Sequence, residues 1–349
     1  MSYSIAKGDC LPLMKSLEPA SVDCVFVDLP YFGIVGDDWD NQWKDRNEYL
    51  DWVVSLAHEW KRITKDNSSI FVFCDEKMEA YIQVRLDEIF LLLNKIVWFK
   101  KNSLAKSATE TFRSFAPVTE RALFYAVGNE TDKFEFEPLR KYLDDERKKA
   151  KLNDKEARRK MGISEKGGGL LSHFWGHAQW MLPTHEQYSK LQKAYHGFFT
   201  KPHDELVREF ESLRRPFNSD SKTFDVIEWA NVNVNDNTDH PTTKPLGLYR
   251  RILSVITNQG QTVLDCCMGS GTAGVAALEL GRNFIGFELK DKYFSIAEAR
   301  IKLAAQSPSF YTLPNNRLHL TGGGLPATQS SFTAEVIPPA KLPAKSPRR

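Results

Sequence analysis

The sequence predicts an α/β fold built on a doubly wound sheet. Apolar runs of strand length alternate with amphipathic helical segments over residues 1–127 and again over 222–305, which is the rhythm of βαβ units. Two of these runs, 22–27 and 262–265, end directly in polar or glycine-rich residues. They are typical of buried parallel strands, and open α/β sheets bind ligands at the carboxyl ends of such strands.

The first half of the chain supplies strands and helices in alternation. A helix is predicted at 49–63 because Leu50, Val53 and Trp60 recur on one face. The segment 101–117 has no periodicity and is predicted to be a loop. The other predicted elements of this half are strands at 70–74, 95–99 and 121–127 and a helix at 76–90.

An inserted block at 128–221 interrupts this alternation. The block is charged and mostly helical, so it is predicted to form a separate subdomain. Within it, 154–175 resembles a helix-turn-helix whose turn lies at 161–164. Two further helices are predicted, at 185–195 and 205–215.

The second half of the sheet domain is predicted at 222–305. A helix at 244–257 begins near Pro245 and turns Leu248 and Ile252 inward. The remaining elements are a strand at 262–265, a helix at 273–280, a strand at 283–287 and a helix at 293–304. The tail, 306–349, is rich in Pro, Ser, Thr and Gly and is predicted to be disordered.

Composition narrows the class of protein. A chain of 349 residues with 42% hydrophobic content is long and apolar enough for a globular domain plus an insertion. No apolar stretch reaches the length that spans a bilayer, and no signal segment is visible, so a cytoplasmic location without membrane contact is expected. The five scattered cysteines are interpreted as free thiols. His173 and His177 have helical ligand spacing, but Gly176 lies between them, and no metal site is predicted.

Charge is concentrated in the inserted block. The net charge of the chain is only +2, yet 140–160 holds ten basic and five acidic residues. This local excess favours contact with phosphate groups, with a solvated helix as the alternative. The candidate contacts with DNA are Arg158, Arg159 and Lys160.

The glycine loop at 269–274 is ambiguous by itself. Its Gly-x-Gly-x-x-Gly spacing matches a dinucleotide-binding loop, and Glu288 lies at a suitable distance to accept hydrogen bonds from a ribose. Asp265 ends the strand beside the loop, where its carboxylate would repel a pyrophosphate but attract an ammonium or sulfonium. S-adenosylmethionine is therefore favoured over a nicotinamide or flavin nucleotide.

Four motifs give a more specific assignment. They are Gly8-Asp9-Cys10-Leu11, the tetrapeptide Asp28-Leu29-Pro30-Tyr31, His240-Pro241-Thr242-Thr243-Lys244-Pro245, and the run from Val263 to Thr272. In this order they resemble the beta group of DNA amino-methyltransferases, with the tetrapeptide first and the cofactor loop last. The resemblance covers 3–127 and 222–305 and implies a Rossmann-like, circularly permuted methyltransferase sheet. Leu29 departs from the usual proline, and Cys266-Cys267 depart from the usual proline and phenylalanine.

The resemblance implies a role for each motif. Asp28 and the backbone carbonyl of Leu29 would accept hydrogen bonds from the target amine, and Tyr31, after Pro30, would stack on a base flipped out of double-stranded DNA. The segments around the sheet would hold S-adenosylmethionine. The implied cofactor contacts are Asp9, Phe32, Thr243, Lys244, Asp265, Gly269, Gly271, Thr272 and Glu288.

Two alternatives remain open at this point. Aspartate at the first tetrapeptide position favours adenine N6 as the target, and cytosine N4 is the nearest rival. A catalytically silent DNA-binding protein on the same scaffold is the alternative of another class, although Asp28, Pro30, Tyr31 and the glycine loop argue against it. A homodimer, a partner restriction enzyme and the recognition sequence are left open.

Overall fold

The computed structural model describes residues 1–33, 42–101, 117–128, 137–162, 171–176, 180–230 and 243–306. These residues fall into two compact units. The larger unit comprises the described residues up to 128 and from 216 to 306. The smaller unit comprises those between 137 and 215.

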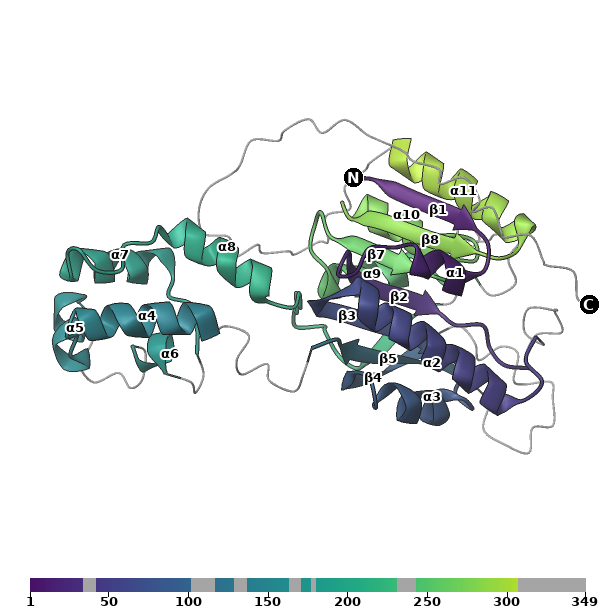
Figure 1. Ribbon diagram of the computed structural model, residues 1–349, viewed down its shortest axis with the longest axis horizontal. Coiled ribbons are helices and arrows are strands. Elements are labelled where there is room, and N and C mark those ends of the chain that lie inside the picture. The colour runs from purple at the N-terminus through teal and green to yellow at the C-terminus, as the bar shows by residue number, and fades with distance from the viewer. Residues whose placement is uncertain are drawn as a thin grey trace, which may run out of the picture. The chain divides into compact units, whose positions relative to one another are not determined.

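The larger unit is built on an eight-stranded sheet in the order β1-β8-β7-β2-β3-β5-β4-β6 (Figure 1). Neighbouring strands from β1 to β3 are parallel, whereas β5 runs antiparallel to both β3 and β4. The first strand lies beside the last, as expected for a permuted chain. The strands are β1 (Tyr3–Lys7), β2 (Val22–Asp28), β3 (Thr64–Cys74), β4 (Leu91–Lys100), β5 (Thr119–Ala126), β6 (Val226–Trp229), β7 (Thr262–Asp265) and β8 (Asn283–Glu288).

Helices cover both faces of the sheet. One apolar core joins one face to α1, α2 and α3, and a second joins the other face to α9, α10 and α11. The helices that follow β1, β2 and β3 therefore lie on one face and those after β7 and β8 on the other, with the change of face between β2 and β7. The helices of this unit are α1 (Cys10–Lys15), α2 (Arg46–Ile63), α3 (Glu79–Leu86), α9 (Leu246–Ile256), α10 (Thr272–Glu279) and α11 (Asp291–Gln306).

Two boundaries differ from the prediction for local reasons. α2 begins at Arg46 because the carboxylate of Asp45 caps it, accepting from the amides of Asn47 and Glu48. α3 is shorter than the predicted 76–90. The residues before it form a turn in which the amides of Met78 and Glu79 donate to the carbonyl of Asp75.

The smaller unit has an apolar core of its own, which includes Leu143, Phe174, Tyr188 and Leu206. The predicted helix-turn-helix is partly described: α5 ends at Lys160, and Gly162 follows with a positive φ of 67°. Residues 163–170, which include Ser164, lie outside the described residues. The helices are α4 (Glu137–Lys149), α5 (Asp154–Lys160), α6 (Ser172–Trp175), α7 (His185–Ala194) and α8 (His203–Leu213).

Some predicted features fall outside the described residues. These are most of the loop predicted at 101–117, the motif residues His240-Pro241-Thr242, His177, and all of the tail except its first residue, Gln306. Within the described ranges, no helix is long and apolar enough to cross a bilayer, and no cluster of His, Cys, Asp and Glu could hold a metal ion. All five cysteines are free thiols.

Candidate active site

A cavity of about 280 Å³ opens at the carboxyl ends of β1, β8, β7 and β2. Asp28 ends β2, Asp265 ends β7 and Glu288 ends β8, and all three line the cavity. Because these strands are parallel, their carboxyl ends meet at one edge of the sheet. The cavity lies where the covering helices change face, which is the usual ligand site of doubly wound sheets.

The glycine loop forms one wall of the cavity. Gly269 and Gly271 both adopt left-handed backbone angles, with φ of 51° and 77°. Only Gly269 faces the cavity, whereas Gly271 packs against α11, where a Cβ would come within 2.9 Å of the Ala297 side chain. The predicted cofactor contact at Gly271 is thus replaced by a packing role that lets α10 approach α11.

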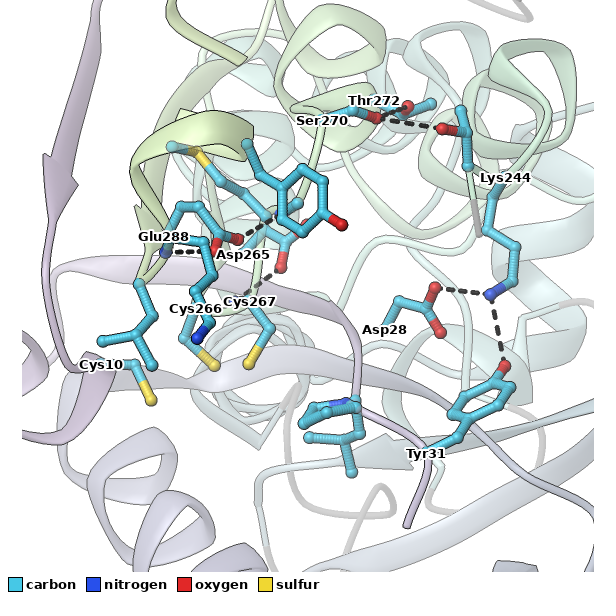
Figure 2. A pocket seen from close by; sticks show the side chains of 18 of the residues that line it. Cys10, Asp28, Tyr31, Lys244, Asp265, Cys266, Cys267, Ser270, Thr272 and Glu288 are labelled. Atoms are coloured by element: carbon cyan, nitrogen blue, oxygen red, sulfur yellow. Dashed lines mark hydrogen bonds and ion pairs between the residues drawn. The ribbon is translucent and has the colours of Figure 1, made fainter. Parts of the chain in front are cut away.

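Two buried carboxylates stand beside this loop (Figure 2). Glu288 accepts hydrogen bonds from the amides of Gly269, at 2.9 Å, and Lys290, at 2.8 Å. Asp265 accepts from the amide of Cys267 at 3.1 Å. Burial raises the pKa of Asp265 well above its ordinary value and also raises the pKa of Glu288, although these backbone amides oppose the shift.

These residues fit a cationic cofactor. The acidic residues around the cavity are Asp9, Asp28, Asp265 and Glu288, and the basic ones are Lys244 and Lys290. A buried carboxylate with a raised pKa is stabilised by a nearby positive charge. The Gly269 amide, which would bind a pyrophosphate in a dinucleotide site, already donates to Glu288. The donor set therefore suits the ammonium and sulfonium of S-adenosylmethionine and disfavours a dinucleotide.

A second cluster surrounds Asp28 on the other side of the cavity (Figure 2). The Lys244 ammonium lies 2.5 Å from Oδ2 of Asp28 and 3.3 Å from the Tyr31 hydroxyl. Only 5% of Lys244 is exposed. The contact joins residues that are 216 positions apart in the chain. Lys244 was predicted to contact the cofactor, and the structure turns its ammonium toward Asp28.

Glu120 completes this cluster. Its Oε2 accepts from the Tyr31 hydroxyl at 3.1 Å and lies 3.2 Å from the Lys244 ammonium, while its Oε1 lies 2.6 Å from the Lys100 ammonium. Burial would raise the pKa of Glu120, but Lys244 and Lys100 outweigh it and the pKa is lowered. Sequence reasoning missed Glu120, although an acidic residue directly before the strand predicted at 121–127 was a usable signal.

The net pKa shift of Asp28 is opposite in direction to that of Glu120. Burial raises the pKa of Asp28 above its ordinary value, although Lys244 opposes the shift. Burial would lower the pKa of Lys244, but Asp28 and Glu120 outweigh it, so Lys244 stays charged. Oδ1 of Asp28 is shielded from solvent and has no hydrogen-bond partner among the described residues. Asp28, which lines the cavity, therefore holds an unused hydrogen-bond acceptor.

The other tetrapeptide residues are fixed by the protein core. The Leu29 amide donates to the carbonyl of Phe73 at 3.3 Å. The carbonyl of Pro30 accepts from the Tyr49 hydroxyl at 3.1 Å. Burial raises the pKa of Tyr31 well above its ordinary value, so its hydroxyl stays protonated as a donor. Phe32 does not line the cavity; its ring packs 5.7 Å from the ring of Tyr49, in contrast to its predicted cofactor contact.

The remaining predicted cofactor residues line the cavity. Asp9 does so while also capping α1, since its carboxylate accepts from the Leu11 amide at 3.0 Å. Thr243 lies with its hydroxyl 3.5 Å from that of Ser270, and Thr272 begins α10. The structure thus brings Asp9, Thr243 and Thr272 to one cavity from three distant segments.

Three thiols form a further part of the wall. Cys10, Cys266 and Cys267 all line the cavity, and Figure 2 shows them beside Asp265 and Glu288. Hydrogen bonds from Cys266 and Cys267 lower the pKa of the Cys10 thiol, while the pKa values of Cys266 and Cys267 are raised. Cys266 and Cys267 stand where the family pattern usually has proline and phenylalanine, so this wall carries thiols in place of apolar side chains.

The predicted DNA contacts lie in the last turn of α5 in the smaller unit. Arg159 and Lys160 are exposed and Arg158 is half-buried. The Lys160 ammonium lies 2.9 Å from Glu156 and 4.8 Å from the centre of the Tyr195 ring. Their contact with DNA stays a prediction.

Comparison with known proteins agrees with this site. Residues 22–299 match a family model for N6 and N4 methyltransferases, described as DNA methylase. The protein named DNA adenine methyltransferase YhdJ, from Escherichia coli, is 22% identical over 307 residues, which cover 86% of this chain and 83% of the relative. Type II methyltransferase M.HinfI, from Haemophilus influenzae, is 24% identical over 324 residues, which cover 88% and 70%.

Solved structures share the fold. The complex of M1.HpyAVI with S-adenosylmethionine superposes with a TM-score of 0.50 at 21% identity, covering 86% of this chain and 98% of that one. The cytosine-N4-specific PvuII DNA methyltransferase superposes with a TM-score of 0.52 at 15% identity, covering 86% of each chain. The matching family model is itself named for both N6 and N4 methyltransferases.

Proposed function

The chain belongs to the DNA methylase family of N6 and N4 methyltransferases, and we propose that it methylates the N6 amine of an adenine flipped out of double-stranded DNA. The methyl donor of this family is S-adenosylmethionine. The observation that carries the proposal is the buried Oδ1 of Asp28, an acceptor for an amine at the edge of the cavity.

The choice of adenine rests on the tetrapeptide and on the relatives. Asp28 stands at its first position, where the resemblance favours adenine. The name of the Escherichia coli relative specifies adenine. Cytosine N4 is the second candidate because its amine poses the same chemical problem and the PvuII enzyme shares the fold.

S-adenosylmethionine supplies a methyl group that its sulfonium makes electrophilic. Asp265 and Glu288 would hold this cofactor through its cationic and hydroxyl groups, with Asp9, Thr243 and Thr272 along the same cavity. The glycine loop lets backbone approach it closely. Binding both reactants in one cavity converts a bimolecular reaction into an effectively intramolecular one.

Asp28 acts on the amine. The lone pair of an exocyclic amine is delocalised into the base, so the nitrogen must gain tetrahedral character before it can attack. Asp28 Oδ1 accepts one hydrogen bond from the amine and the carbonyl of Leu29 accepts the other. The methyl donor, when bound, would give its methyl group to the amine nitrogen, and Asp28 or water would take the surplus amine proton. Asp28 must be ionised for the first contact.

Tyr31 would support the flipped base. The Lys244 ammonium lies 5.0 Å from the centre of the Tyr31 ring. This cation and the hydrogen bond to Glu120 hold the ring, on which the base would stack.

Residues of the smaller unit would also bind the DNA. Arg159 and Lys160, exposed on α5, and Arg158 beside them would contact phosphates. Five free thiols suit a reducing compartment, which supports our proposal that the enzyme acts on DNA in the cytoplasm.

Methyl transfer from labelled S-adenosylmethionine to duplex DNA tests the proposal. Digestion of the product to nucleosides separates N6-methyladenine from N4-methylcytosine by mass spectrometry. We expect N6-methyladenine from the wild type and about 10²-fold less from D28A. N4-methylcytosine as the product would select the second candidate. DNA binding without any methyl transfer would indicate the catalytically silent alternative.

A further inference from the structure

Glu120 reaches the active site from a strand that carries none of the family motifs. Phe73, near the end of β3, is the partner of both Asp28 on β2 and Ala122 on β5. Because β5 runs antiparallel to β3, the residues before Ala122 extend past the carboxyl end of β3, toward Asp28. The sheet register therefore places Glu120 beside the tetrapeptide.

The two carboxylate oxygens of Glu120 contact different residues. Oε2 contacts two residues of the cavity wall, the Tyr31 hydroxyl at 3.1 Å and the Lys244 ammonium at 3.2 Å. Oε1 contacts Lys100, at the end of β4, at 2.6 Å. The side chain is 17% exposed. Glu120 does not itself line the cavity, so it acts through its neighbours.

The charges in this cluster balance. The cations Lys100 and Lys244 face the anions Asp28 and Glu120. A buried charge that loses its partner is strongly destabilised, so each member holds the others in place. Lys244 lies between the two carboxylates, and its position decides which oxygen of Asp28 is left for a ligand.

We propose that Glu120 is a positioning residue of this site: it divides the Lys244 ammonium between two carboxylates and anchors the Tyr31 ring. The proposal rests on the proposed function only for the identity of the bound amine and base. Through Lys244, Glu120 leaves Asp28 Oδ1 as the acceptor for the amine. Through the Tyr31 hydroxyl, it fixes the ring on which the base stacks.

The two tasks can be separated by substitution. E120Q keeps the size of the side chain and removes its charge, so Lys244 pairs with Asp28 alone. E120D keeps the charge and shortens the side chain, so the carboxylate stays near the cluster but withdraws from the Tyr31 hydroxyl and the Lys244 ammonium. The negative charge of Glu120 raises the pKa of Asp28, and the positive charge of Lys244 lowers it. The pKa of Asp28 should therefore fall in E120Q and rise in K244M.

Carbon-13 NMR titration of labelled aspartate carboxyl groups measures the first task without any substrate. The Asp28 signal is assigned by its loss in D28N. We expect the Asp28 titration to move down by roughly half a pH unit or more in E120Q and up in K244M. A buried carboxylate outside the site provides the control. Glu79 is 11% exposed on its side chain and contacts Lys95 at 2.6 Å, and E79Q should leave the Asp28 titration unchanged.

Steady-state methylation of DNA measures both tasks. In E120Q the acid limb of the kcat/KM profile should follow the Asp28 titration downward. In E120D that limb should move less than in E120Q, because the negative charge is kept, while the KM for DNA rises about 3- to 10-fold, because base stacking is weakened. E79Q should change neither quantity.

An Asp28 titration that is the same in wild type and E120Q would overturn the proposal, as would an unchanged KM for DNA in E120D. A wild type that transfers no methyl to DNA would instead refute the proposed function. The NMR titration would still decide whether Glu120 sets the charge state of Asp28.

Discussion

The amide of Gly269 donates to Oε2 of Glu288 at 2.9 Å, so a backbone donor of the glycine loop is already bound to a carboxylate of the protein itself. In a dinucleotide site the amides of such a loop bind a pyrophosphate. Here Glu288 and Asp265 present their carboxyl groups to the cavity. This one contact separates the two cofactor classes that the loop sequence leaves open.

The first prediction concerns cofactor choice. Calorimetry should detect binding of S-adenosylmethionine and of its demethylated product, and no binding of a nicotinamide dinucleotide. D265A should weaken binding of S-adenosylmethionine about 10- to 100-fold, because a hydrogen bond or ion pair to a charged group is lost. E228Q, which removes an exposed carboxylate paired with Lys101 at 2.7 Å, is the control. Tight dinucleotide binding would refute the cofactor assignment.

The second prediction concerns Asp28. D28A removes the acceptor for the amine and leaves Asp265 and Glu288 untouched. We expect kcat for methyl transfer to fall about 10²- to 10³-fold while the affinity for S-adenosylmethionine changes little. The measurements are single-turnover methylation and calorimetry on the same preparation. Near-normal turnover in D28A would show that another group accepts the amine.

The third prediction concerns pH. Burial raises the pKa of Asp28, so this carboxylate keeps its proton to a higher pH than an ordinary aspartate. The reaction requires the ionised form, so kcat/KM should decline as the pH is lowered. The midpoint of this decline should lie above the ordinary aspartate pKa of about 3.9. The pH profile of wild-type methylation measures this limb. A limb at or below the ordinary aspartate value would contradict the shift.

The fourth prediction concerns the smaller unit. Replacing Arg158, Arg159 and Lys160 together by alanine should weaken binding to all DNA sequences alike. The slope of a plot of log affinity against log salt concentration should also become shallower by about 1 to 3, since fewer counterions are released on binding. Affinity for S-adenosylmethionine should not change. Identical slopes in wild type and triple variant would leave α5 as a solvated helix and place the DNA contacts elsewhere.

The fifth prediction concerns the thiols. Hydrogen bonds lower the pKa of Cys10, whereas burial raises the pKa values of Cys24 and Cys74. At neutral pH iodoacetamide should therefore modify Cys10 about 10-fold faster than the other two. S-adenosylmethionine should protect Cys10 because the thiol lines the same cavity. Peptide mass spectrometry with C10S as control measures both effects, and equal labelling of all three residues would contradict them.

The alternation of strands and helices was readable from the sequence because local patterns dictate it. β2 is buried along its whole length except at Asp28, and its apolar run is what such a strand requires. The boundaries of α2 and α3 were less accurate because they depend on a capping carboxylate at Asp45 and on a turn at Asp75. Propensity alone does not resolve such contacts.

The motifs also located most of the cavity. Asp28, Asp265 and Glu288 end parallel strands, and this placement brings them to one edge once the strands pair. Phe32 was assigned to the cofactor because it follows the tetrapeptide, and Gly271 because it belongs to the glycine loop. The structure turns Phe32 toward Tyr49 and Gly271 toward Ala297, since packing rather than position in a motif decides where a side chain points.

The sequence by itself determined the fold class, the order of the motifs and the kind of chemistry, because each is encoded in short runs of neighbouring residues. Only the tertiary structure decided which charges meet. The pairing of Lys244 with Asp28 spans 216 positions, and Glu120 joins it from an antiparallel strand without a motif. Sheet register sets such contacts, and burial then fixes the pKa values of the residues that make them.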